Sequence, residues 1–130
     1  MSLITTPISH GELLDKITIL EIKAAHIADA AKLANVRTEL DLLQRTWEAD
    51  GAAQQDLGDA RARLKAVNQK LWDIEDQIRL KEKAKAFDAD FIALARAVYF
   101  TNDERAAIKR EINVAVGSAL VEEKSYQSYV

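Results

Sequence analysis

The sequence predicts an all-α fold, an antiparallel bundle of four to five helices, and three observations support this prediction. Only 4 glycines and 1 proline occur among 130 residues, so few positions interrupt a helix. Apolar residues recur at alternating intervals of three and four along most of the chain, which is the helical period. Capping residues mark the expected helix starts, the clearest being the S-x-x-E box of Ser9 and Glu12. We expect residues 1–130 to form a single helical domain.

The first helix is expected over about Ser9–Ile27, because the capping box is followed by a segment that is apolar on most of its circumference. Such a helix is usually surrounded by protein. A second helix is expected after Asp29, a suitable N-cap residue. It should end at Asp50 and Gly51, with the glycine in the left-handed conformation that commonly follows a helix.

The third helix is expected to be the longest, over about residues 54–86. At about 1.5 Å per residue it would reach roughly 45 Å, so one end should project or pack on a second subunit. A fourth helix is expected from Asp88. A fifth is expected from Thr101, which opens a second T-x-x-E capping box, to Gly117. The tail, residues 118–130, has no clear period and is expected to be a short helix or an extended arm.

Composition and charge exclude several classes of function. The net charge is −3 and basic residues are interleaved with acidic ones, which argues against a nucleic-acid-binding face. The chain has no cysteine, so disulfides, thiolate ligands and thiol catalysis are excluded. No apolar run approaches the roughly 18 residues that span a membrane, and no signal-peptide pattern is present. We therefore expect a cytoplasmic protein that binds neither membranes nor nucleic acids.

Five polar residues within apolar helical arcs are the best candidates for a ligand site: Arg37, Asn68, Glu75, Arg79 and Arg105. One interpretation is a pocket between helices that holds a small anion, because arginine recognises carboxylate and phosphate through a two-point fork. The other is that these residues form a solvated face, where Glu75 and Arg79 make an i,i+4 pair. The sequence leaves both interpretations open.

Other chemical signatures are weak or absent. His10 and His26 are isolated and lack a partner at metal-ligand spacing, so no metal site is predicted. Glu12 and Asp15 have the spacing of paired Mg²⁺-binding carboxylates, but Glu12 is already explained by capping. Glycine-rich phosphate loops and nucleophile–base signatures are missing. No cofactor is expected, and no catalytic residue is assigned.

Several segments resemble a small bacterial family of uncharacterised all-helical proteins, the DUF6165 type of domain of unknown function. The resemblance is carried by residues 8–23 and 32–40, and extends through residues 71–79 and 102–105 to residues 122–126. It covers nearly the whole chain. It implies no activity, because the family has none to transfer.

A second, fainter likeness is to the all-helical chorismate mutases, short helical chains with one very long helix that intertwine as dimers. This resemblance implies a pocket for a dicarboxylate. The first helix here lacks the arginine that the opening helix of that family brings to its site, so no catalytic residue is transferred. The residues that would take part in such a pocket are Arg37, Glu75, Arg79, Arg105 and Lys109.

Two functional hypotheses follow. The leading one is a non-catalytic helical domain that acts by association, first with itself as a homodimer, because apolar surface is abundant and catalytic signatures are lacking. The alternative is an enzyme or binder for a small anionic metabolite that uses the polar residues inside the apolar arcs. Under the leading hypothesis, the protein is an interaction domain rather than an enzyme.

Overall fold

The computed structural model describes residues 2–130 and confirms the all-α prediction. Within this part of the chain there are four α-helices, one short 3₁₀ helix and no strand. In chain order these are α1 (His10–His26), α2 (Ala30–Ala49), the 3₁₀ helix η1 (Gly51–Gln54), α3 (Ala60–Lys83) and α4 (Ala89–Val116).

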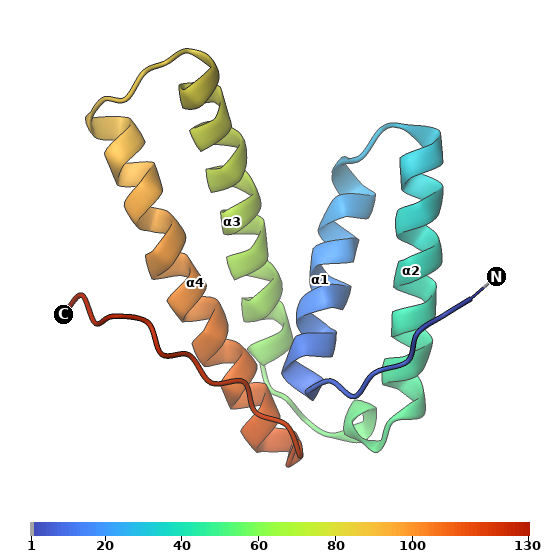
Figure 1. Cartoon of the computed structure of the whole chain (residues 1–130). Helices are drawn as coiled ribbons and strands as arrows, with labels where there is room; N and C mark the ends of the chain where they lie inside the picture. The colour runs from blue at the N-terminus through green and yellow to red at the C-terminus, as the bar shows by residue number, and fades with distance from the viewer. Residues whose placement is uncertain (1) are drawn as a thin grey trace.

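The helices form two antiparallel hairpins, α1–α2 and α3–α4, that meet at one end and diverge toward the other (Figure 1). Helix α1 packs against all three other α-helices, whereas α2 packs mainly on α1 and η1. The position of α1 between its neighbours explains why its sequence is apolar on most of its circumference.

The hydrophobic core lies where the two hairpins meet. Leu14 and Ile17 of α1, Leu64 of α3 and Ile112 of α4 are fully buried there. Trp47 of α2 also packs in this core. Burial of each such side chain contributes about 1.5–3 kcal/mol, so this junction holds the hairpins together.

Several helix ends lie where capping residues predicted them. Ser9 begins α1, and its side chain accepts a hydrogen bond from the backbone N–H of Glu12. Asp29 and Asp88 cap α2 and α4 in the same way. Gly117 ends α4 in the left-handed conformation, with φ of 68°.

The third helix is shorter than expected and is not the longest. It begins at Ala60 rather than near residue 54, because a turn at Asp56–Gly58 interrupts the chain: Gly58 has φ of 59° and donates its N–H to Asp56. It ends at Lys83, where Lys85 adopts a left-handed conformation and the N–H of Ala86 donates back to the carbonyl of Lys81. Helix α3 has 24 residues and α4 has 28.

The prediction of separate fourth and fifth helices is wrong, because residues 89–116 form one continuous helix. Thr101 was expected to cap a new helix but is buried in the middle of α4, with 1% of its surface exposed. A capping sequence begins a helix only where the preceding chain leaves the helical path, and at Thr101 the chain stays helical and packs into the interior.

The prediction for Gly51 is also wrong. Among the described glycines only Gly58 and Gly117 have positive φ, and Gly51 instead begins η1. Asp50 caps the start of η1: its carboxylate accepts a hydrogen bond from the backbone N–H of Ala52 at 2.8 Å.

The tail, residues 118–130, is the extended arm of the two expected alternatives. It leaves the end of α4 and runs back along that helix (Figure 1). None of the helices within residues 2–130 has both the length and the apolar character needed to cross a membrane.

Candidate functional site

A buried lysine on α4 gathers carboxylates from two other segments. The Nζ of Lys109 lies 2.6 Å from Glu12 and 3.6 Å from Asp15, both on α1, and 3.0 Å from Glu122 in the tail. The side chains of Lys109 and Asp15 are only 10% and 8% exposed. The cluster therefore ties α1, α4 and the tail together through charge.

The two strongest contacts of this cluster keep it ionised. Burial lowers the pKa of Lys109, but its hydrogen bonds to Glu12 and Glu122, together with the negative charges of Asp15 and Glu12, outweigh burial and raise the pKa above its usual value. The hydrogen bond from Lys109 in turn lowers the pKa of Glu122. A lysine surrounded by carboxylates in this way acts as a structural clamp, because protein groups already compensate its charge.

The start of α1 is built to approach α4 closely. The N–H of Gly11 donates to Asn113 Oδ1 at 2.7 Å, and a Cβ on Gly11 would lie 2.5 Å from the backbone oxygen of Lys109. Only glycine fits at this distance. The same approach brings the carboxylate of Glu12 to Lys109.

A second polar chain links α1, α3 and α4. Asn68 of α3, 4% exposed, donates its amide to Asp15 at 2.8 Å and to Thr18 at 3.0 Å. Its oxygen accepts a hydrogen bond from Arg105 at 3.3 Å. Arg105 also donates to Asn102 at 2.8 Å. The buried amide thus connects the Lys109 cluster to a partly buried arginine.

Arg105 and Asn102 form the shared wall of two cavities. The inner cavity, of about 280 Å³, lies between α1, α3 and α4, and the outer cavity, of about 700 Å³, lies between α4 and the tail. The inner cavity is lined mainly by apolar side chains, with Asn68 and Glu75 as its other polar residues. The apolar lining consists of Ile19, Ile22, Leu71, Trp72 and Val98.

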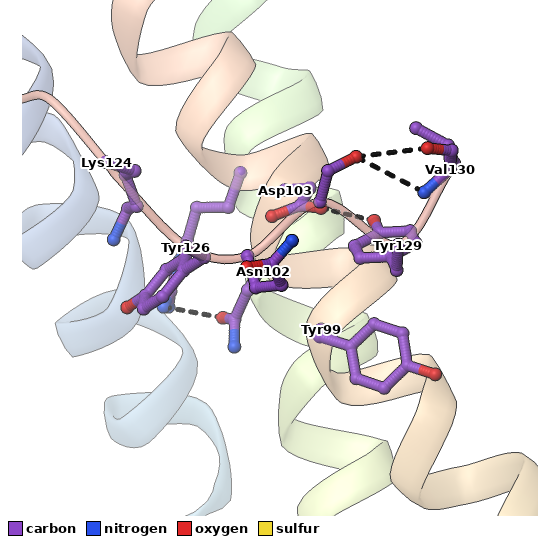
Figure 2. A pocket seen from close by; sticks show the side chains of 10 residues that line it. Tyr99, Asn102, Asp103, Lys124, Tyr126, Tyr129 and Val130 are labelled. Atoms are coloured by element: carbon purple, nitrogen blue, oxygen red, sulfur yellow. Dashed lines mark hydrogen bonds between the residues drawn. The ribbon is translucent and has the colours of Figure 1, made fainter.

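The tail and α4 line the outer cavity from two sides, as Figure 2 shows. Tyr129 packs against Tyr99, with ring centroids 5.1 Å apart, and donates its hydroxyl to Asp103. This hydrogen bond raises the pKa of Tyr129 to about 12. Lys124 lies over the ring of Tyr126 in the same segment. Aromatic and cationic side chains therefore surround the approach to Arg105.

The structure brings three of the five predicted ligand residues together. Asn68, Glu75 and Arg105 line the inner cavity. Arg79 is not among its lining residues: its side chain is 76% exposed and pairs with Glu75 at 3.1 Å, as an i,i+4 surface pair. Arg37 is exposed on α2, which packs mainly on α1 and so lies away from this cavity. Asn68, Glu75 and Arg105 thus line a cavity between helices, whereas Arg79 and Arg37 are exposed.

Sequence reasoning named Lys109 only through the likeness to the chorismate mutases, and it did not single out Asn113. Lys109 lies on the same side of its helix as Arg105 and Ile112, so the criterion that selected Arg105 applies to it equally. The partners of Lys109 were not predictable, because Glu12 is 97 residues away in the sequence.

The histidines occupy separate environments. His10 contacts Asp50 at 3.1 Å and packs edge-on against Trp47. His26 contacts Gln69 and the ring of Trp72. Within residues 2–130, no three histidine, aspartate or glutamate side chains are grouped so that they could hold a metal ion.

The outer half of the α3–α4 hairpin presents a different surface. No residue between Glu75 and Phe100 is buried. Leu80, Phe87 and Ile92 are 65%, 55% and 57% exposed. A groove of about 580 Å³ runs between the two helices here, and its lining includes Leu80. We call residues 75–100 the hairpin arm.

Comparison with known proteins assigns a family. No curated protein and no solved structure shows significant similarity to the chain. The model of the family of unknown function DUF6165 matches residues 4–130, nearly the whole sequence. The chain therefore belongs to the DUF6165 family.

Proposed function

We propose that the protein is a non-catalytic helical domain that self-associates as a homodimer through its hairpin arm. The observation that carries this proposal is that the hairpin arm has no buried residue and yet exposes Leu80, Phe87 and Ile92, while its two helices remain regular throughout. Residues 23–46 also lack buried residues, but Leu42 is the one large apolar side chain exposed there. Helices are marginal in water without tertiary packing of an apolar face. A second copy would cover Leu80, Phe87 and Ile92.

The charge pattern of α3 favours a second copy of the same chain as the partner. Around Gln77, the preceding turn carries Asp73, Glu75 and Asp76, whereas the following turns carry Arg79, Lys81 and Lys83 with one carboxylate, Glu82. When two α3 helices pack antiparallel about a two-fold axis near Gln77, the acidic half of each faces the basic half of the other. Such a symmetric interface uses one self-complementary patch twice.

The test is the mass of the full chain in solution, measured by light scattering after size-exclusion chromatography. We expect twice the chain mass of 14.5 kDa at micromolar concentration. Leu80→Glu places a charge in the apolar groove and should shift the mass to that of the monomer. Leu42→Glu is the matched control, because Leu42 is 43% exposed on α2, away from the arm.

Two outcomes would overturn the proposal. The first is a wild-type chain that remains monomeric at high micromolar concentration. The second is a dimer that Leu80→Glu and Leu42→Glu weaken equally, since the interface would then lie elsewhere. Circular dichroism of both variants verifies that the helices are retained.

A further inference from the structure

We infer that Arg105 anchors a binding site for a small organic anion that joins one carboxylate or phosphate group to an apolar ring or chain. The inner cavity meets the hairpin arm only at its inner end, through Glu75 and Val98, and the inference does not depend on self-association. It rests on the partners of Arg105, on the fixed orientation of Asn68 and on the lining of the inner cavity.

The guanidinium of Arg105 is bound only to neutral groups. It donates to the amide oxygens of Asn68 and Asn102, at 3.3 and 2.8 Å. Throughout residues 2–130, no carboxylate lies within 4.0 Å of it, in contrast to Lys109 one turn further along α4. A guanidinium has five N–H donors, so Arg105 keeps donors and a full positive charge for a ligand.

Asn68 holds the guanidinium in place without neutralising it. Its amide nitrogen donates to Asp15 and Thr18, so its oxygen must face Arg105. The carboxylate of Asp15 is thereby directed to Asn68 and Lys109, away from the arginine. A positioned arginine that loses little side-chain entropy on binding is suited to a carboxylate or phosphate.

The inner cavity selects the rest of the ligand. Its apolar walls, including Leu71, Trp72 and Val98, favour an apolar body of limited size, since its volume is about 280 Å³. Glu75 also lines it and is 44% exposed in its pair with Arg79. A second anionic group on the ligand would meet this carboxylate, so a single anionic group is preferred.

The outer cavity provides access from the tail side. It shares Asn102 and Arg105 with the inner cavity, so an anionic group at Arg105 can be reached from both. Lys124 of the tail also lines it but is paired with Glu122 at 3.0 Å, and Asp103 accepts the hydroxyl of Tyr129. The attraction on an anion at the shared wall would therefore come mainly from Arg105.

The test is a titration of the full chain with benzoate and with benzamide, which share a ring but differ in charge. In two-dimensional ¹H–¹⁵N spectra the two tryptophans give separate indole N–H signals, and Trp72→Phe identifies that of Trp72. Trp72 lines the inner cavity and Trp47 lies in the core, so benzoate should move the Trp72 signal and leave that of Trp47 in place. The affinity for benzamide should be lower than that for benzoate by roughly tenfold or more.

Arg105→Gln keeps hydrogen-bonding capacity and removes the charge, so it should weaken benzoate binding roughly tenfold or more. Arg61→Gln is the matched control, because Arg61 is also partly buried and donates to an amide, that of Gln44, at 3.3 Å. It should leave the affinity unchanged. If Arg105→Gln does not fold, the comparison of benzoate with benzamide on the wild type still decides the question.

Further probes test the ligand class. Phenyl phosphate should also bind, and the ratio of its affinity to that of benzoate shows which head group the site prefers. Inorganic phosphate should bind more weakly than either, because it lacks an apolar body. Terephthalate, with a second carboxylate across the ring, should bind more weakly than benzoate. Equal binding of benzoate and benzamide, equal effects of the two arginine variants, tighter binding of terephthalate, or no change at Trp72 would overturn the inference.

Discussion

At the scale of single residues, two cations one turn apart on α4 have opposite environments. Lys109 is enclosed by three carboxylates, whereas Arg105 contacts only amides. The difference arises from what α1 and α3 present to each: Glu12 and Asp15 face the lysine, and Asn68 faces the arginine. One cation is thus used to hold the fold and the other is left available.

The role of Lys109 predicts a large loss of stability on its removal. Lys109→Met would leave the buried carboxylate of Asp15 without its cation, so the free energy of unfolding should fall by about 3–5 kcal/mol. Arg79→Ala breaks an exposed pair and should cost no more than about 1 kcal/mol. Urea unfolding followed by circular dichroism measures both, and similar losses in the two variants would contradict a clamping role for Lys109.

How far the site could be predicted depended on whether a residue's partners are local. Asn68 and Arg105 were predicted because a polar residue inside an apolar arc must find a partner or a cavity. Apart from Asn102, which lies on the same helix as Arg105, their partners and those of Lys109 come from other helices and from the tail, which no local pattern reveals. Arg79 met the same criterion as Asn68 but lies on the hairpin arm, where no other helix covers it.

At the scale of elements, the crossing of α1 over α4 depends on Gly11. A Cβ there would lie 2.5 Å from the backbone oxygen of Lys109 and 3.0 Å from Asn113 Oδ1. Gly11→Ala should therefore push the helices apart and destabilise the protein by about 1–3 kcal/mol. Gly51→Ala is the control, since a Cβ at Gly51 would meet nothing within 4 Å and Gly51 does not have positive φ.

Thermal unfolding of the two glycine variants tests this crossing. Gly51→Ala should be neutral or slightly stabilising, because it reduces the conformational freedom of the unfolded chain. A Gly11→Ala variant as stable as the wild type would mean that α1 and α4 are less closely packed than the structure indicates.

Helix starts were predictable wherever the cap is a local contact. Ser9, Asp29 and Asp88 each bond a backbone N–H three residues ahead, so sequence alone located them. Thr101 has a similar sequence context but lies inside α4, where its neighbours in the fold bury it. Tertiary packing decides between these cases, and a local capping pattern carries no information about that packing.

At the scale of the whole molecule, the two hairpins share one core and then separate (Figure 1). Both hairpins continue beyond that junction, the α1–α2 hairpin over residues 23–46 and the α3–α4 hairpin over the hairpin arm, and neither stretch has a buried residue. The sequence predicted that one end of a long helix would project or meet a second subunit. The arm is the part of the molecule where that expectation can be tested.

Cross-linking at the proposed two-fold axis tests self-association most directly, and the chain contains no cysteine that would interfere. Gln77→Cys places one thiol per chain near the axis, and Arg45→Cys places one on the exposed face of α2 as the control. With a short bismaleimide cross-linker at low micromolar concentration, we expect Gln77→Cys to give a covalent dimer in high yield and Arg45→Cys to stay monomeric. Equal yields from the two variants, or no dimer from Gln77→Cys, would contradict a homodimer built on the hairpin arm.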